Sequence, residues 1–154
     1  MRKARILVVD DDESIRTVFK INLERRGYSV ETAGTGEEAI KKVKAGFYNL
    51  ALIDIRLPDM EGTELLTALG PSVPEMVKII VTGFPTMHNA VEAVNRGAHG
   101  YVLKPVDMEE LIRLIEEHLE RQRAERAYSE EKVSEFIETR ARELRGVSGS
   151  YLQA

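Results

Sequence analysis

Short apolar runs, each about the length of one β-strand, alternate along this chain with segments of helical periodicity. Predominantly apolar runs occupy residues 6–9, 50–55, 77–81 and 100–103, and a more polar run occupies residues 28–32. A continuous apolar run of this length is typical of a strand buried on both faces, so we expect the more polar run nearer an edge. The alternation predicts an α/β fold, a doubly wound five-stranded parallel sheet with right-handed crossovers and helices on both faces.

Helix signals follow each run. Apolar residues at Ile15, Phe19 and Leu23 predict a helix that ends near Gly27. Thr35 and Glu38 have the spacing of a capping box, and residues 89–95 predict a further helix. A strong helical pattern begins at residue 108.

Polar residues follow the apolar runs at the points where the strands should end. In open parallel sheets the functional crevice lies beyond the carboxyl ends of the strands, so these residues are expected at one edge. They are Asp10, Asp11 and Asp12 after the first run, Asp54 in the third, Thr82 after the fourth, and Lys104 with Pro105 after the fifth.

These residue types together favour phosphoryl transfer at a metal site. Clustered carboxylates repel one another unless a cation lies among them, and Mg²⁺ prefers oxygen ligands. A carboxylate can attack a phosphoryl group and form an aspartyl-phosphate. Lys104 would neutralise charge on the phosphoryl oxygens, and the Thr82 hydroxyl would donate a hydrogen bond to one of them.

Each of these residues also has an ordinary structural explanation. Acidic residues before a helix often cap its N-terminus, and for Asp12 capping alone is enough. A lone lysine is usually a solvated surface charge, and a lone threonine is usually a turn residue. The joint occurrence of these residue types, each at its own strand end, favours the functional explanation.

Four motifs resemble the receiver domain of two-component response regulators, in order and with family-like spacing. They are ILVVDDD (6–12), LIDIRLPDMEG (52–62), VTGF (81–84) and YVLKP (101–105). The resemblance covers about residues 4–120. It implies a (βα)5 fold with the flavodoxin-like strand order 2-1-3-4-5, here followed by an extended C-terminal helix.

The resemblance also implies roles for residues of the acidic group. Asp54 matches the phosphoacceptor and a Mg²⁺ ligand. Asp11 matches a direct ligand, Asp10 a ligand that acts mostly through water, and Arg56 the position whose backbone carbonyl completes the metal site.

Further residues match a conformational switch. Thr82 matches the switch hydroxyl, Tyr101 the aromatic switch residue and Lys104 the phosphate-binding lysine, and the Lys104–Pro105 bond resembles the family's cis peptide. Phosphorylation would draw Thr82 toward the phosphate and Tyr101 inward. The face formed by the fourth helix, the fifth strand and the fifth helix would then change its affinity for partners.

The expected function is that of a signalling switch rather than a metabolic enzyme, although the domain would catalyse its own phosphorylation and dephosphorylation. The phosphoryl group would come from a sensor histidine kinase or a phosphotransfer protein. A homodimer through the fourth-helix and fifth-helix face or through the C-terminal helix is a further expected partner. Two alternatives stay open, the receiver part of a truncated transcription regulator and a scaffold that works without phosphorylation.

Composition excludes several other classes. The net charge of -4, a pI of about 5.5 and the lack of a basic stripe argue against direct binding of nucleic acid by this chain. Without cysteine there are no disulfides or thiolate sites, which fits a cytoplasmic location. No apolar run is long enough for a signal peptide or a membrane span.

One glycine-rich motif is typical of a different class of protein, the dinucleotide-binding oxidoreductases. Residues 34–39 match G-x-G-x-x-A, and Asp54 lies at the distance typical of dinucleotide-binding folds. That motif should follow the first strand of its fold, but here it follows the second, so we do not favour an oxidoreductase.

Beyond a receiver domain at residues 1–120, residues 121–154 are expected to form a helical extension or linker with a loose tail. Val133, Ile137 and Leu144 share an apolar helical face, and Gly146 is a candidate helix end. Two arrangements fit: the fifth helix continues and pairs with a second copy, or a separate amphipathic helix begins near Ser129.

Overall fold

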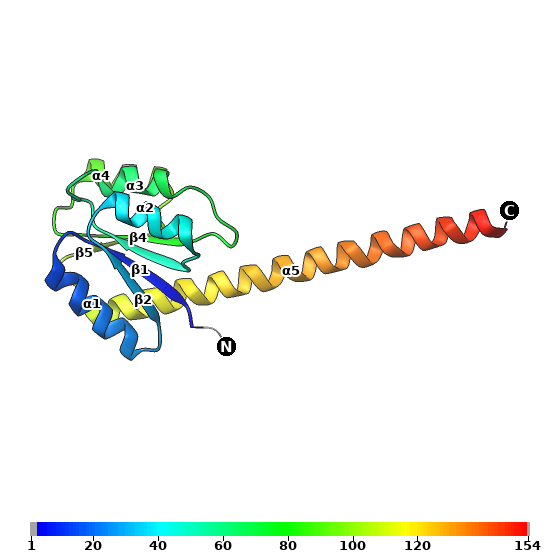
Figure 1. Ribbon diagram of the computed structural model, residues 1–154, viewed down its shortest axis with the longest axis horizontal. Helices are drawn as coiled ribbons and strands as arrows, with labels where there is room; N and C mark the ends of the chain where they lie inside the picture. Colours follow the sequence, from blue (N-terminus) through cyan, green and yellow to red (C-terminus); the bar gives the residue numbers. More distant parts are fainter. Residues whose placement is uncertain (1–2, 154) are drawn as a thin grey trace. The chain divides into compact units, whose positions relative to one another are not determined.

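The computed structural model describes the backbone of residues 3–153 and the side chains of residues 3–146. Within residues 3–153, five strands alternate with five helices (Figure 1). The strands are β1 (Arg5–Val9), β2 (Ser29–Ala33), β3 (Leu50–Ile53), β4 (Val77–Thr82) and β5 (Gly100–Leu103). The helices are α1 (Glu13–Arg25), α2 (Gly36–Ala45), α3 (Gly62–Leu69), α4 (Met87–Asn95) and α5 (Met108–Gln153).

The strands pair in parallel in the order β2-β1-β3-β4-β5, which confirms the predicted sheet and its strand order. The more polar strand, β2, lies at an edge, as its composition predicted. Strands β1, β3 and β4 are buried along almost their whole length, because helices cover both faces of the sheet.

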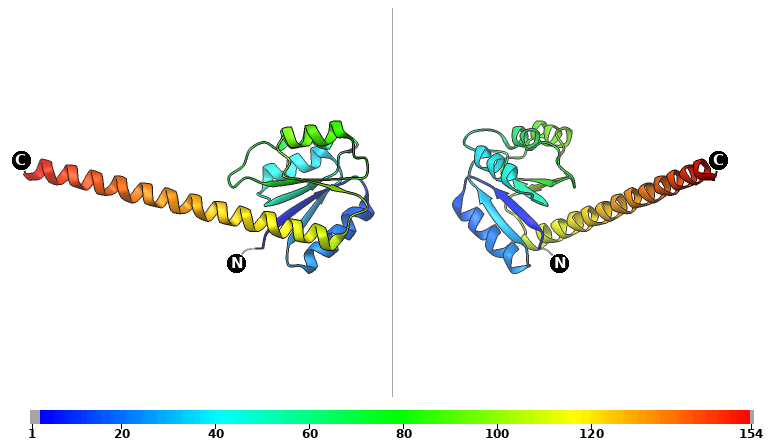
Figure 2. Two further views of the ribbon diagram at one scale, coloured as in Figure 1. Left: turned by 180° about the vertical axis from the view of Figure 1, so that it is seen from behind. Right: turned by 45° about the vertical axis from the view of Figure 1, so that its right-hand side comes forward.

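Alternate residues of β1 enter two different hydrophobic cores. Ile6 and Val8 face the core that α1 and the first turns of α5 cover, while Leu7 and Val9 face the core under α2, α3 and α4. Figure 2 shows these two layers of helices on opposite sides of the sheet. This sandwich leaves the carboxyl ends of the strands and the loops after them free to form a site.

Local signals explain where helix α1 begins and ends. The Asp12 side chain accepts hydrogen bonds from the N–H groups of Ser14 and Ile15, at 2.8 and 3.2 Å, so Asp12 is an N-cap as its position suggested. After the helix, Gly27 has a φ of 94°, a conformation that glycine adopts without strain.

Some predicted boundaries were wrong. The strand predicted over residues 50–55 ends at Ile53, because Asp54 begins the turn toward α3. The helix predicted over residues 89–95 begins at Met87, where the Thr86 side chain caps it by accepting a hydrogen bond from the Asn89 N–H.

The chain divides into two compact units, Met1–Leu119 and Glu120–Ala154. Helix α5 passes through this boundary without a break, which confirms the predicted extended C-terminal helix and excludes the alternative of a separate helix from Ser129. The helix also continues beyond Gly146 to Gln153, so the predicted helix end at Gly146 is wrong; glycine in a helix costs only about 1 kcal/mol relative to alanine. Among the described residues, no helix combines the length and the apolar character needed to cross a membrane.

Candidate functional site

Backbone hydrogen bonds bring the ends of β1 and β3 together. The Asp54 N–H donates to the carbonyl of Val9 at 2.9 Å, and the Asp10 N–H donates to the carbonyl of Ala33 at 3.1 Å. Asp10 and Asp54 therefore emerge side by side, and both are buried, with exposed fractions of 3% and 7%. Asp11 is exposed, at the mouth of the same site.

The three carboxyl groups converge. One oxygen atom from each of Asp10, Asp11 and Asp54 lies within 4.8 Å of the others. Like charges at this separation repel strongly unless a cation lies among them, and three carboxylate oxygens suit a hard divalent ion such as Mg²⁺. The residues present therefore fit the metal that the sequence predicts.

Lys104 enters the site from β5. Its backbone N–H donates to the carbonyl of Thr82 at 2.8 Å, which joins the ends of β4 and β5. Its ammonium group donates to Asp10 Oδ2 at 2.7 Å and to Asp54 Oδ2 at 3.2 Å. The bond between Lys104 and Pro105 is cis, the isomer that the resemblance implies.

Burial and the close approach of Asp10, Asp54 and Lys104 shift the pKa values of Asp54 and Lys104. Burial, and then the charge of Asp10, raise the pKa of Asp54, although Lys104 and the Arg56 N–H oppose the shift. Burial alone would lower the pKa of Lys104, but the hydrogen bonds and charges of Asp10 and Asp54 outweigh it and raise the pKa. The lysine thus stays charged at neutral pH, while the charge on Asp54 is energetically unfavourable.

Thr82 is fully buried at the end of β4, and its hydroxyl accepts a hydrogen bond from the Phe84 N–H at 3.0 Å. The hydroxyl is therefore engaged within its own loop in this structure.

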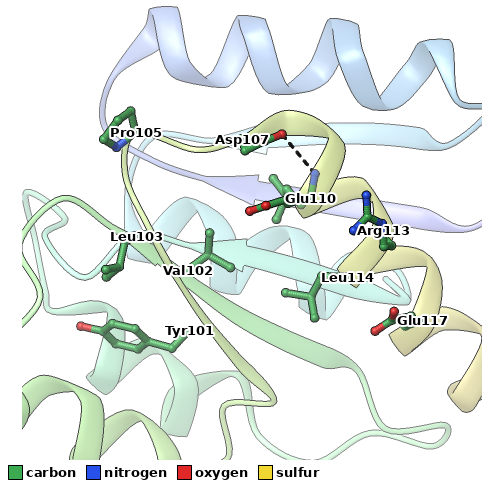
Figure 3. A pocket seen from close by; sticks show the side chains of 10 residues that line it. Tyr101, Val102, Leu103, Pro105, Asp107, Glu110, Arg113, Leu114 and Glu117 are labelled. Atoms are coloured by element: carbon green, nitrogen blue, oxygen red, sulfur yellow. Dashed lines mark hydrogen bonds between the residues drawn. The ribbon is translucent and has the colours of Figure 1, made fainter.

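Tyr101 lies on β5, and its ring packs against the core under α2, α3 and α4. Among the described residues its buried hydroxyl has no hydrogen-bond partner of good geometry, although it is near enough to the Thr86 backbone to interact with it. Burial raises the pKa of Tyr101, against a smaller opposing effect of Thr86. Beside β5, a groove of about 540 Å³ runs between the strand and α5, and Figure 3 shows Leu103 and Leu114 on its walls.

Two side-chain contacts near the acidic group, made by Arg16 and Arg56, were missed by the sequence analysis. The Arg16 guanidinium donates to the Asp10 carbonyl at 2.7 Å and so holds the end of β1 from α1. The Arg56 guanidinium lies 3.8 Å from the centre of the Phe84 ring, a cation–π contact between the loops that follow β3 and β4. A lone arginine has no sequence signal that would reveal either contact.

The glycine-rich motif at residues 34–39 follows β2, the edge strand, rather than the first strand. The Thr35 hydroxyl accepts from the Glu38 N–H at 3.1 Å, and a Glu38 carboxylate oxygen accepts from the Gly34 N–H at 2.9 Å. Side chains of the motif thus satisfy two of its own amide groups, which a dinucleotide phosphate would otherwise need.

Comparison with known proteins agrees with this geometry. The profile of the family described as response regulator receiver domain matches residues 6–116. The chain belongs to this family. A solved receiver from Methanospirillum hungatei JF-1, described as a CheY-like response regulator receiver domain protein, is 47% identical. Its match covers 80% of this chain and 99% of that one, with a TM-score of 0.78.

Curated relatives of this receiver are longer proteins. The uncharacterized transcriptional regulatory protein YkoG of Bacillus subtilis (strain 168) is 36% identical over 115 residues, which are 75% of this chain and 50% of YkoG. The transcriptional regulatory protein ZraR of Klebsiella oxytoca is 38% identical over 114 residues, which are 74% of this chain and 26% of ZraR. The chain thus spans from a quarter to a half of the length of these relatives.

Proposed function

We propose that this receiver is a phosphorylation switch in which Asp54 accepts a phosphoryl group from a sensor histidine kinase or a phosphotransfer protein in the cytoplasm. The observation that carries the proposal is the convergence of the Asp10, Asp11 and Asp54 carboxylates within 4.8 Å, with the Lys104 ammonium hydrogen-bonded to two of them. A cluster of acids beside one fixed cation supplies both a nucleophile and a place for charge to develop.

In the proposed reaction a carboxylate oxygen of Asp54 attacks the phosphorus atom, and the bond between phosphorus and the donor's leaving atom breaks. The donor leaves with that electron pair and is protonated, for example as neutral histidine. Asp10, Asp11, Asp54 and the backbone carbonyl of Arg56 would hold Mg²⁺, which when bound neutralises charge on the phosphoryl oxygens. Lys104 would pair with a phosphoryl oxygen, and water would later hydrolyse the acyl phosphate, which releases inorganic phosphate and restores the carboxylate.

The conformational response to phosphorylation would involve Thr82 and Tyr101. Thr82 would exchange its hydrogen bond with the Phe84 N–H for one to the phosphoryl group. Because the structure has the Tyr101 hydroxyl buried, the switch requires an equilibrium between this arrangement and a more exposed one, which phosphorylation would shift.

Intact mass after incubation with acetyl phosphate and Mg²⁺ tests the chemistry, with Asp54→Asn as the matched control. We expect the mass of one phosphoryl group on the wild type only, and no added mass when EDTA replaces Mg²⁺ during the incubation. A donor that phosphorylates the variant equally would refute Asp54 as the acceptor. Failure with acetyl phosphate and with purified histidine kinases would favour the scaffold that works without phosphorylation.

A homodimer is the second proposal about partners. Met87, Val91 and Val94 expose apolar side chains on α4, and Leu103 does so on β5. An exposed apolar patch of this kind is typical of an interaction surface. A beryllofluoride-activated NtrC4 receiver domain whose solution structure is a dimer is 35% identical, with a TM-score of 0.72; the match covers 77% of this chain and 98% of that one.

Sedimentation with and without beryllofluoride and Mg²⁺ tests this dimer. We expect a monomer that becomes a dimer on addition of beryllofluoride, and Val94→Glu should prevent the change if α4 forms the interface. Alternatively, the exposed Val133, Ile137 and Leu144 of α5 would pair two copies regardless of phosphorylation, and Ile137→Glu would then abolish the dimer.

The transcription regulators among the relatives support a second candidate function, the receiver part of a longer transcription regulator. Sequencing the full reading frame would decide between a separate receiver and the receiver part of a longer regulator. A DNA-binding segment beyond these residues, with DNA affinity that phosphorylation of Asp54 changes, would establish the longer regulator.

A further inference from the structure

The first turn of α2 is capped by a side chain from a distant loop. Asp59, which lies between β3 and α3, accepts hydrogen bonds from the N–H groups of Gly36 and Glu37, one on each carboxylate oxygen and both at 2.9 Å. Thr35, the helix's own N-cap, takes only the Glu38 N–H. Asp59 thus satisfies the two amides that Thr35 leaves free.

The charge of Asp59 strengthens this cap. Hydrogen bonds from Gly36 and then Glu37 lower the pKa of Asp59, so its carboxylate is ionised at neutral pH. A negative charge at a helix N-terminus also interacts favourably with the helix dipole. The bidentate geometry fixes the direction of the side chain as well as its distance from the helix.

The next residue, Met60, adds an apolar contact at the same place. Gly36 has no side chain, and a Cβ atom built on it would lie 2.6 Å from the Cγ of Met60. The methionine side chain therefore occupies space that only glycine leaves open. Asp59 and Met60 together fasten the tip of their loop to the start of α2.

This loop is short and closed at its base. Arg56 pairs with Glu61 in an antiparallel bridge, and the Leu57 N–H donates to the Met60 carbonyl at 3.2 Å. The Arg56 N–H also donates to Asp54 Oδ1 at 3.4 Å. A shift at the tip of so tight a loop is transmitted to Arg56 and, through it, to the Asp54 side chain.

We propose that Asp59 is a positioning residue for the metal site, which holds the loop after β3 against α2 so that the Arg56 carbonyl and the Asp54 carboxylate keep their places. This inference rests on the proposed Mg²⁺-dependent phosphorylation of Asp54. Asp59 itself touches neither the metal ligands nor the reacting atoms. Its effect passes along the loop from the tip to the base.

Calorimetric titration of the full chain with Mg²⁺ tests the proposal, together with thermal unfolding. Asp59→Ala should raise the Kd for Mg²⁺ by about tenfold, the lower end of the effect typical of outer-shell groups. Asp59→Asn keeps one acceptor oxygen and should raise it less. The matched control is Thr35→Ala, which removes the helix's own cap at the same helix end, and it should lower the thermal midpoint similarly while leaving the Kd within about twofold.

Two results would overturn the inference while leaving the proposed function standing. Equal changes in Kd for Asp59→Ala and Thr35→Ala would mean that only the stability of α2 matters. An unchanged Kd for Asp59→Ala would mean that the loop holds its place without the clamp. A wild-type chain that binds no Mg²⁺ in the same titration would instead reject the proposed function, and the positioning role with it.

Discussion

The ammonium group of Lys104 lies 2.7 Å from Oδ2 of Asp10, although 94 positions separate the two residues in the chain. The same nitrogen lies farther, 3.2 Å, from Oδ2 of Asp54, so the lysine pairs more closely with the neighbour of the proposed phosphoacceptor. Both carboxylates are buried, and without Mg²⁺ Lys104 is the cation that hydrogen-bonds to both. Stability and metal binding should therefore be linked at this site.

Lys104→Met should destabilise the protein without Mg²⁺, because it leaves two buried carboxylates without their cation. We expect a loss of about 2 kcal/mol, less than for fully buried pairs because the Lys104 side chain is 19% exposed. Added Mg²⁺ should recover much of the lost stability, and urea unfolding with and without Mg²⁺ measures this recovery.

The control is Lys20→Met, which removes an exposed ion pair with Glu24 and should change the free energy of unfolding by less than about 0.5 kcal/mol. A loss for Lys104→Met that Mg²⁺ does not reduce would contradict this linkage.

Asp54→Asn should stabilise the Mg²⁺-free protein at neutral pH. The pKa of Asp54 is raised by burial and by Asp10, so the folded protein holds this proton more tightly than the unfolded chain does. Wild-type stability from this group therefore falls as pH rises through the raised pKa. The variant carries no charge there, so its advantage should be present at pH 7 and vanish as pH falls through the pKa of Asp54. Thermal midpoints across this range measure it, and an advantage that stays constant at acidic pH would refute the explanation.

The sequence pattern predicted the parallel sheet and the convergence of Asp10, Asp54 and Lys104 at one edge, because parallel strands place their carboxyl ends together. The strand order came from the resemblance to receiver domains. The sequence did not predict contacts that depend on tertiary placement. The cap of α2 shows why: Thr35 and Glu38 form a local signal, whereas Asp59 reaches that helix from 23 residues away. A continuous α5 was one of two arrangements that the sequence left open, because Ser129 and Gly146 are local signals for a helix start and a helix end that the long helix overrides.

Tyr48→Phe should destabilise the opposite end of β1 and β2. The buried Tyr48 hydroxyl donates to the Glu31 carboxylate, and the Arg5 guanidinium lies 4.5 Å from the centre of the ring. We expect a loss of about 1 kcal/mol at pH 7, typical of one hydrogen bond, or somewhat more because the acceptor is charged.

The stability difference between the wild type and Tyr48→Phe should decrease at alkaline pH. Burial and the bond to Glu31 raise the pKa of Tyr48 from 10.0 to about 12. The stabilisation by the neutral hydroxyl is fully present below pH 10 and is lost as pH rises through about 12. The difference between wild type and variant should therefore shrink across that interval in urea unfolding. A difference that is the same at pH 7 and pH 12 would contradict the assignment.

Gly62→Ala should disturb the backbone beside the proposed phosphoacceptor. A Cβ atom on Gly62 would lie 2.9 Å from the Asp54 carbonyl carbon and 3.0 Å from the Ile55 Cα, and backbone atoms cannot move aside as a flexible side chain can. The Gly62 N–H also donates to the Ile55 carbonyl at 2.6 Å, which keeps the start of α3 close to the end of β3. We expect a loss of about 2 kcal/mol in urea unfolding, typical of overpacking, and weaker Mg²⁺ binding because Asp54 must shift.

The control is Gly146→Ala. Its added Cβ atom meets open space, and the substitution should stabilise α5 by up to about 1 kcal/mol. If Gly62→Ala bound Mg²⁺ as the wild type does and unfolded at the same urea concentration, the close approach of α3 to Asp54 would not be required.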